Sequence, residues 1–206
     1  MKKLSTREFV LLALLIAILI VLGYLNIPMP GGLSITFNMI PLAIAAIAVG
    51  PLGGLIVGAA FGLISFAQCF GVLGSSAQGI ALLGEGVSPV WLFIQRVVPR
   101  VLDGLLLGYI FRFLKRRANI YVSCAVTGFF AAFLNTAMFM SLLVLMFQHT
   151  AYLSERMAGR GFFAYIIATV GINGLVEMVV STVLTAAVGT ALHKSGFIRN
   201  VTKKVG

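Results

Sequence analysis

The stretch WLFIQRVVPR, residues 91–100, places two arginines one helical turn apart inside an apolar tract that runs over residues 90–113. A tract of this length can cross a membrane as a helix. A charged side chain at membrane depth is energetically costly, so such residues face the interior of a bundle, where they pair or mark a functional site. The stretch therefore predicts a membrane helix that turns Arg96 and Arg100 inward.

The composition of the whole chain agrees with a membrane protein. Of its 206 residues, 60% are hydrophobic and 10% are charged, and the mean hydropathy is +1.09. A soluble domain of this length could not bury so much apolar surface, so lipid must be the solvent for most of it. Because no polar stretch is long enough for a soluble domain, we predict a single membrane domain over residues 1–206.

Apolar segments separated by Pro/Gly-rich or charged loops predict an all-α bundle of six transmembrane helices. The second segment is short: its residues reach only about half of the hydrocarbon thickness, so it must be tilted, broken or extended. The predicted spans cover residues 8–25, 39–49, 55–70, 90–113, 121–147 and 161–192.

The net charge of +10 is explained by membrane orientation and does not indicate a nucleic-acid partner. Basic residues are enriched in cytoplasmic loops of membrane proteins. With six spans, this rule predicts that the N- and C-termini and the loop RFLKRR are all cytoplasmic. The basic residues that carry this prediction are Lys2, Lys3, Arg7, Arg112, Lys115, Arg116, Arg117, Lys194, Arg199, Lys203 and Lys204.

Small residues recur at helical spacing in two places. Gly50, Gly54, Gly58 and Gly62 follow one another every fourth residue, a pattern that lets helix backbones approach closely within a bundle. Ala13 and Ala17, in ALLIA, form a second pair of this kind on the first span. Alanine is common in membrane helices, so this pair alone indicates little.

The chain lacks the motifs of several enzyme classes. It has no Walker A motif, no His-rich or Cys-pair spacing for a metal, and no Ser-His-Asp set within the membrane. Cys69 and Cys124 are isolated in apolar segments and are expected to act as small hydrophobic residues. We therefore expect no catalytic residue, no metal and no cofactor in this chain.

Polar residues reach similar depths on three predicted spans. At the rise of an ideal helix, Arg96 lies about 10 Å below the outer boundary, Arg100 about 16 Å and Asp103 about 21 Å. Asn135 and Asn173 both lie at about 18 Å and Glu177 at about 24 Å by the same rule. Arg100 can pair with Asp103 or Glu177, so we predict structural ion pairs for these three, with a ligand role as the alternative.

Arg96 has no acidic residue three or four positions away on its own helix, which favours a bound anion as its partner. The alternative is that its side chain extends to the outer interface. Trp91 and Gln95 precede it on the same helix and are predicted to line the same site, although Trp91 alone would suit an interface anchor. The amides Asn38, Gln68, Asn135 and Asn173 complete the predicted binding residues, with helix–helix hydrogen bonding as the alternative for each.

Five motifs together resemble a known family. They are ALLIA (13–17), ITFNMIPLAIAAIAVGPLGGLIVGAAFGLI (35–64), PRVLDGLLLGYIF (99–111), LNT (134–136) and NGLVE (173–177). The chain resembles the substrate-binding S components of energy-coupling factor (ECF) vitamin transporters over nearly its whole length. Within this class, the third and fifth motifs are most similar to those of pantothenate-type S components.

The resemblance implies a subunit that captures a vitamin at the outer face of the bacterial plasma membrane. It implies partners as well: a transmembrane coupling subunit and two ATPases, which would supply the ATP and Mg²⁺ that this chain lacks. Ala13 and Ala17 would face the coupling subunit, and the loop over residues 26–38 would close over the site. The vitamin site would lie in the outer halves of the later helices, near Arg96.

Other functions stay open at this point. S components for cobalamin, riboflavin or folate share the implied fold, and the long segments 71–89 and 148–160 could widen a site for cobalamin. A small membrane enzyme should show convergent catalytic pairs, and none is visible. A membrane scaffold without a ligand would not need Arg96 beside several amides.

Overall fold

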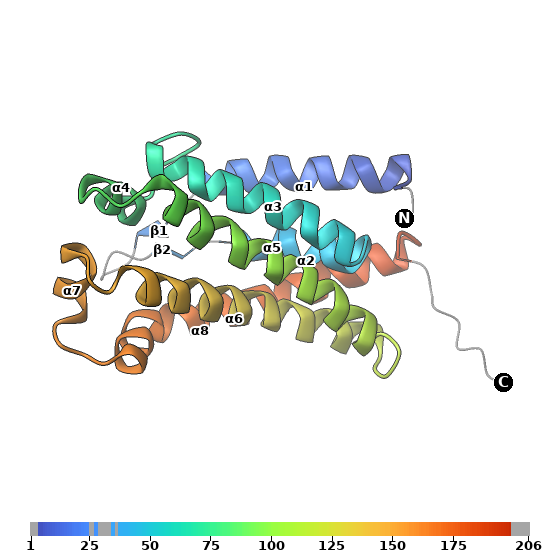
Figure 1. Cartoon of the computed structure of the whole chain (residues 1–206). Coiled ribbons are helices and arrows are strands. Elements are labelled where there is room, and N and C mark those ends of the chain that lie inside the picture. The colour runs from blue at the N-terminus through green and yellow to red at the C-terminus, as the bar shows by residue number, and fades with distance from the viewer. Residues whose placement is uncertain (1–3, 25–26, 29–33, 36, 199–206) are drawn as a thin grey trace.

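The chain folds into a bundle of long helices that run side by side along one axis (Figure 1). The structure is a computed structural model. It describes residues 4–24, 37 to 171 and 174–198 with their side chains, and the four strand residues 27–28 and 34–35 by their backbone. For residues 172 and 173, only the backbone is described, and the central part of the predicted closing loop 26–38 lies outside the described residues.

The helices match the predicted spans closely, and shorter elements lie between them. Strand β1 pairs antiparallel with strand β2. The sequence patterns did not predict this pair of strands. The elements are α1 (Thr6–Tyr24), β1 (Ile27–Pro28), β2 (Ser34–Ile35), α2 (Met39–Ala48), α3 (Pro51–Ala67), the 3-10 helix η1 (Gln68–Phe70), α4 (Ala77–Gly84), α5 (Pro89–Leu114), α6 (Ile120–Phe147), α7 (Ala151–Met157) and α8 (Phe162–Lys194).

Local sequence explains where several helices begin. The side chains of Ser76, Ser88, Asn119 and Thr150 each accept a hydrogen bond from a backbone N–H in the first turn of α4, α5, α6 and α7. Such caps satisfy N–H groups that have no partner inside the helix. Proline at the first position of α5 has no N–H to leave unpaired, and its fixed φ suits the start of a helix.

Glycines bring α3 and α5 into backbone contact. A Cβ atom at Gly54 would collide with the carbonyl group of Gly104, and one at Gly58 with the carbonyl oxygen of Arg100. A Cβ atom at Gly62 would lie 2.8 Å from the Cα atom of Val97, closer than real contacts allow. The prediction of close packing along this glycine repeat is confirmed, and its partner is the helix that carries both arginines.

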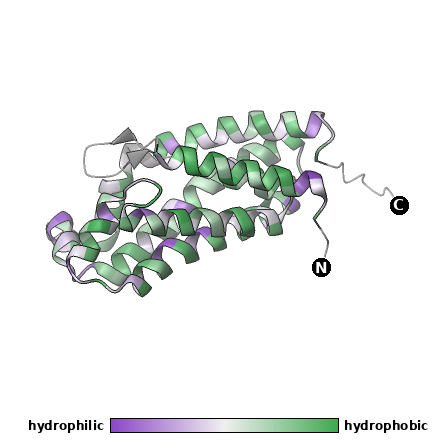
Figure 2. Cartoon of the chain, turned by 90° about the horizontal axis from the view of Figure 1, so that it is seen from above, coloured by the Kyte–Doolittle hydropathy of each residue, from purple (hydrophilic) through white to green (hydrophobic). Residues whose placement is uncertain are grey.

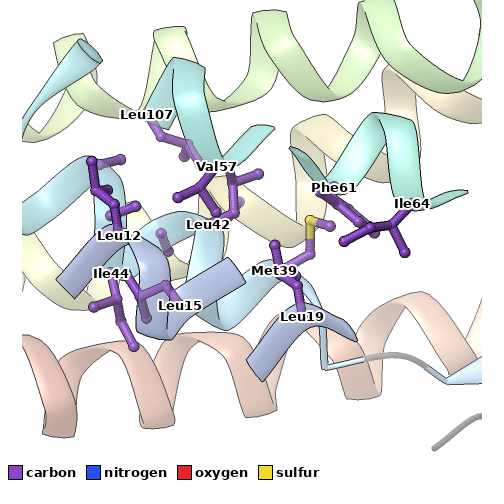
Figure 3. Packing of buried hydrophobic residues seen from close by; sticks show 14 residues of the cluster. Leu12, Leu15, Leu19, Met39, Leu42, Ile44, Val57, Phe61, Ile64 and Leu107 are labelled. Atoms are coloured by element: carbon purple, nitrogen blue, oxygen red, sulfur yellow. The ribbon is translucent and has the colours of Figure 1, made fainter. Parts of the chain in front are cut away.

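The short helix α2 lies inside the bundle. It contacts α1, α3, α5, α6 and α8, and eight of its ten residues are buried. Figure 3 shows Met39, Leu42 and Ile44 of α2 packed among leucines of α1 and residues of α3 and α5. The surrounding helices therefore cover most of this short segment.

Helix α8 is broken near its beginning, which corrects the prediction of one continuous span over residues 161–192. Gly171 has φ 26° and ψ −123°, outside the helical region, and separates an apolar helix over Phe162–Gly171 from a longer one over Gly174–Lys194. A residue other than glycine rarely adopts a positive φ. Asn173 and Glu177 follow this break. The depths estimated for them assumed an unbroken helix, so these depths do not apply.

Within the described residues, four helical segments are long and apolar enough to cross a membrane: Thr6–Tyr24, Pro51–Phe70, Ile120–Phe147 and Gly174–Lys194. Helix α5 has 26 residues, enough to reach across the hydrocarbon, but it includes four charged residues. Figure 2 shows hydrophobic residues along most of the long helices and hydrophilic ones gathered mainly at the two ends. The structure is therefore that of an all-helical membrane protein apart from its two short strands.

The two ends of the bundle differ (Figure 1). At the terminal end, α1 begins, α8 ends, and α5 runs into the basic loop that leads to α6. At the opposite end, which we call the loop end, lie the short elements α4, α7, β1 and β2. The start of α1 and the end of α8 lie at the same end of the bundle, an arrangement that an even number of membrane crossings would produce.

Candidate functional site

Arg96 lies on the buried face of α5, in its half toward the loop end, and is only 4% exposed. Its Nη2 atom donates hydrogen bonds to Ser76 Oγ at 3.1 Å and to Gln78 Oε1 at 3.0 Å. Its Nη1 atom donates to Ser65 Oγ at 3.5 Å. Its Nε atom is buried and has no hydrogen-bond partner within the described part of the chain. Arg96 is therefore buried and held by side chains of α3 and of the start of α4.

One aromatic ring lies beside both arginines. The Phe139 ring of α6 has its centroid 5.0 Å from Cζ of Arg96 and 4.9 Å from Cζ of Arg100. Phe61 of α3 also lies beside Arg100, with its ring centroid 4.5 Å from Cζ. Cation–π contacts of this kind contribute about 2 kcal/mol when desolvated. These ring contacts hold the guanidinium groups in place and leave their N–H groups available for hydrogen bonds.

The predicted ion pair of Arg100 and Asp103 includes no hydrogen bond between the two side chains. Arg100 Nη1 donates instead to the carbonyl oxygen of Arg96 at 2.7 Å. Asp103 is fully buried, and its two carboxylate oxygens accept no hydrogen bond from any described residue. Helical side chains lean toward the N-terminus of the helix, which carries the Arg100 guanidinium away from Asp103. The pairing of Glu177 with this group stays a prediction.

Three of the predicted amides have buried atoms without partners. Gln95 is fully buried, and neither its Oε1 nor its Nε2 is hydrogen-bonded within the ranges that the structure describes. The Oδ1 atoms of Asn38 and Asn135 are also buried and have no hydrogen-bond partner among the described residues. A buried polar group without a partner costs about 1–3 kcal/mol. These amides therefore favour the binding of water or of a polar solute.

Gln68 and Trp91 differ from these three amides, and the side chain of Asn173 is not described. Gln68 donates its Nε2 to the carbonyl oxygens of Gly23 and Leu73, at 3.3 and 3.2 Å, so it ties α1 to the loop after η1. Trp91 is 56% exposed, as expected for an interface anchor and not for a buried site. The side chain of Asn173 lies outside the described residues, and its role stays a prediction.

Short elements at the loop end lie close to Arg96. Ser76 and Gln78 belong to the start of α4, and Glu85 follows its last residue. Glu85 Oε1 accepts a hydrogen bond from the backbone N–H of Tyr152 in α7 at 2.6 Å. Burial raises the pKa of the Tyr152 phenol, while the positive charges of Arg156 and Arg96 oppose that rise. Helices α4 and α7 are therefore linked to each other and to the region of Arg96.

Ser65, Ser76, Gln78 and Phe139 were not among the predicted site residues. Serine, glutamine and phenylalanine are common in membrane helices and loops, and these four contribute from α3, α4 and α6. The only sequence signal was the polar character of residues 71–89 between two apolar spans. Among the described residues, no group of three or more His, Cys, Asp or Glu could hold a metal ion.

The small-residue pair on α1 faces outward. Ala13 and Ala17 are exposed, while Leu12, Leu15 and Leu19 of the same helix are buried. The alternative that these alanines pack inside the bundle is therefore wrong. Their docking role stays a prediction.

Fold and site together define a helical membrane protein with two buried arginines and with three amides whose buried atoms have no hydrogen-bond partner among the described residues. Residues 7–189 match the family described as "ECF transporter, substrate-specific component". The chain belongs to this family, which confirms the resemblance seen in its motifs.

Two curated proteins are similar to the chain over most of its length. The pantothenic acid transporter PanT of Lactococcus lactis subsp. cremoris is 29% identical over 208 residues, covering 95% of this chain and 98% of that protein. The pantothenate transporter PanT of Leuconostoc mesenteroides subsp. mesenteroides is 29% identical over 193 residues, covering 91% of this chain and 89% of that protein.

Proposed function

We propose that this chain is the pantothenate-binding S component of an ECF-type importer. The observation that carries the proposal is Arg96, a buried guanidinium whose hydrogen-bond acceptors are neutral and whose Nε atom has no partner among the described residues. The names of the two similar transporters support pantothenate as the vitamin.

The chemistry of the site suits a small, singly charged anion. A carboxylate makes shorter and stronger hydrogen bonds to a guanidinium than neutral oxygen atoms do. Pantothenate has one carboxylate for Arg96, and its hydroxyl and amide groups can pair with Gln95, Asn38 and Asn135. Each of these pairings would satisfy a polar atom that is now buried without a partner.

We propose six transmembrane crossings with both termini in the cytoplasm. Four crossings are apolar helices, and α5 and α2, the latter packed inside the bundle, would supply the other two. The basic residues at the terminal end favour the cytoplasm for that end. The loop end, with α4 and α7, then faces the outside of a bacterial plasma membrane, where the vitamin would enter.

Transport requires partners in this proposal. A transmembrane coupling subunit would dock on the outward face of α1 at Ala13 and Ala17, and two ATPases would bind the ATP and Mg²⁺. This chain would contribute the vitamin site and no catalytic step. The whole chain, residues 1–206, would act as one binding domain.

Calorimetric titration of the purified chain with pantothenate tests the proposal. We expect saturable binding of one pantothenate per chain and no binding of riboflavin, folate or cobalamin under the same conditions. Binding of one of those vitamins instead of pantothenate would contradict the substrate assignment. Binding of none of them would contradict the proposed function as a whole.

A further inference from the structure

The hydrogen bonds of Arg96 leave one conflict for a carboxylate ligand. A guanidinium offers two edges for bidentate binding, one formed by Nε and Nη2 and the other by Nη1 and Nη2. Both edges include Nη2. In this structure, Nη2 donates to Ser76 Oγ and to Gln78 Oε1, which uses both of its N–H groups. A carboxylate can therefore bind in the bidentate way only when one of these two contacts is broken.

Ser76 is the less replaceable of the two. Its hydroxyl oxygen also accepts a hydrogen bond from the backbone N–H of Gly79 at 3.2 Å, as the N-cap of α4. Loss of such a cap costs about 1 kcal/mol of helix stability. Ser76 also has a short side chain that the start of α4 fixes in place. Displacement of Ser76 would thus disturb α4 itself.

Gln78 is easier to displace from Arg96 than Ser76 is. It reaches Arg96 from the first turn of α4 with a long, partly exposed side chain, and its acceptor is a neutral amide oxygen. A charged acceptor forms a stronger hydrogen bond to the same guanidinium. The Nε atom has no hydrogen-bond partner among the described residues, so it offers a second donor next to Nη2 once Gln78 has moved.

We propose that Gln78 is an internal competitor for Arg96, which occupies Nη2 in the empty site and is displaced by the carboxylate of the ligand. This inference rests on the proposed function, because it takes Arg96 as the carboxylate partner. It assigns to Gln78 a role in selectivity: only an acceptor stronger than a neutral amide displaces it. The contact also keeps the buried guanidinium hydrogen-bonded when no ligand is present.

Two substitutions at Gln78 test the proposal in opposite directions, with pantothenate as the probe and calorimetry as the measurement. Gln78→Ala removes the competitor and should tighten binding about 2- to 10-fold, the range for one neutral hydrogen bond. Gln78→Glu supplies a permanent carboxylate to Arg96 and should weaken binding about 30-fold or more, as for competition with a buried charge pair. Gln78→Glu should also raise the melting temperature of the ligand-free chain.

The control is Gln148→Glu, which makes the same charge change at an exposed position at the end of α6, also at the loop end. It should leave affinity within about 2-fold of wild type, since an exposed charge is screened by salt. Equal weakening by Gln148→Glu and Gln78→Glu would overturn the proposal, because general repulsion would then explain both.

Weaker or unchanged binding by a folded Gln78→Ala chain would also overturn the proposal, since Gln78 would then be a ligand contact or a bystander. Gln78→Met keeps the length of the side chain without a strong acceptor, and it replaces the alanine variant if that variant does not fold. The wild-type chain and Arg96→Ala are titrated with pantothenate in the same series of calorimetric measurements. Failure of the wild type to bind pantothenate would overturn the proposed function itself, whereas wild-type binding with unchanged Gln78 variants overturns only the inference about Gln78.

Discussion

At the scale of single residues, Arg96 is the side chain on which the proposed binding depends. Replacement of Arg96 by alanine should weaken pantothenate binding by about 2–5 kcal/mol, the usual effect of leaving one member of a buried charge pair unpaired. Arg96→Lys should restore only part of this loss, because an ammonium group lacks the planar, bidentate geometry of a guanidinium. Calorimetry of both purified variants measures the effect.

The control for Arg96 is Arg160→Ala, which removes an exposed arginine at the loop end. This variant should bind pantothenate as the wild type does. If Arg96→Ala folds and binds with unchanged affinity, the carboxylate partner is some other group.

Arg100 is expected to act on stability more than on binding. Its guanidinium donates to the carbonyl oxygen of Arg96 and lies beside the rings of Phe61 and Phe139. Arg100→Ala removes these contacts and leaves a cavity, which should lower the free energy of unfolding by about 2–4 kcal/mol. Thermal unfolding should show a similar drop with and without pantothenate. A drop only in the presence of pantothenate would show instead that Arg100 contacts the vitamin.

Residue-scale sequence reasoning predicted the inward position of Arg96 and not its partners. The cost of a charge in lipid is a local property, so the composition around residues 91–100 was enough to turn Arg96 inward. Ser65, Gln78 and Phe139 contact it from other helices, and tertiary packing alone decides which residues meet there. For the same reason, the sequence did not predict that Arg100 donates its hydrogen bond to a backbone carbonyl oxygen and not to Asp103.

At the scale of helices, the contact between α3 and α5 positions both arginines. Gly54→Ala should destabilise the chain by about 1–3 kcal/mol, because its Cβ atom would meet the backbone of Gly104, which cannot move like a flexible side chain. The matched control is Gly84→Ala at the end of α4, where a Cβ atom would meet nothing within 4 Å. Melting temperatures in detergent measure both variants, and equal values would contradict the backbone contact.

Periodic patterns predicted the long helices and missed the features that depend on backbone details. The four-residue glycine repeat predicted close packing, and α3 indeed touches α5 along it. The break at Gly171 was missed because one glycine inside an apolar run also suits an unbroken helix. Helices α4 and α7 are too short for a periodic signal, so segments 71–89 and 148–160 read as loops.

At the scale of the whole molecule, the chain should bind its vitamin and transport nothing alone. Its site is made of an arginine and amides, and its sequence contains no ATP-binding motif. Liposomes that contain only this chain should therefore show no pantothenate uptake with or without a proton or sodium gradient. Uptake driven by either gradient would contradict the need for a coupling module. Binding by the same liposomes is the control that the chain is folded.

The outward face of α1 is the part of the molecule best placed to meet that coupling module. Ala13 and Ala17 lie one turn apart on this face, exposed beside Leu14 and Val21. In lipid there is no hydrophobic drive between helices, so close contact across small residues must supply much of their association. Leucine at both positions would hold a partner helix away without touching the buried face of α1.

We therefore expect Ala13→Leu with Ala17→Leu to abolish ATP-dependent uptake and co-purification with the coupling subunit, while pantothenate affinity stays near that of the wild type. Arg96 and its partners lie on α3, α4, α5 and α6, and none of them belongs to α1. Calorimetry together with the yield of co-purified subunits measures the two effects separately. The control, Leu14→Ala with Val21→Ala, makes the same exposed face smaller and should retain the partner. Loss of both binding and co-purification in the leucine variant, or of neither, would exclude a docking role for Ala13 and Ala17, because only a docking surface separates the two.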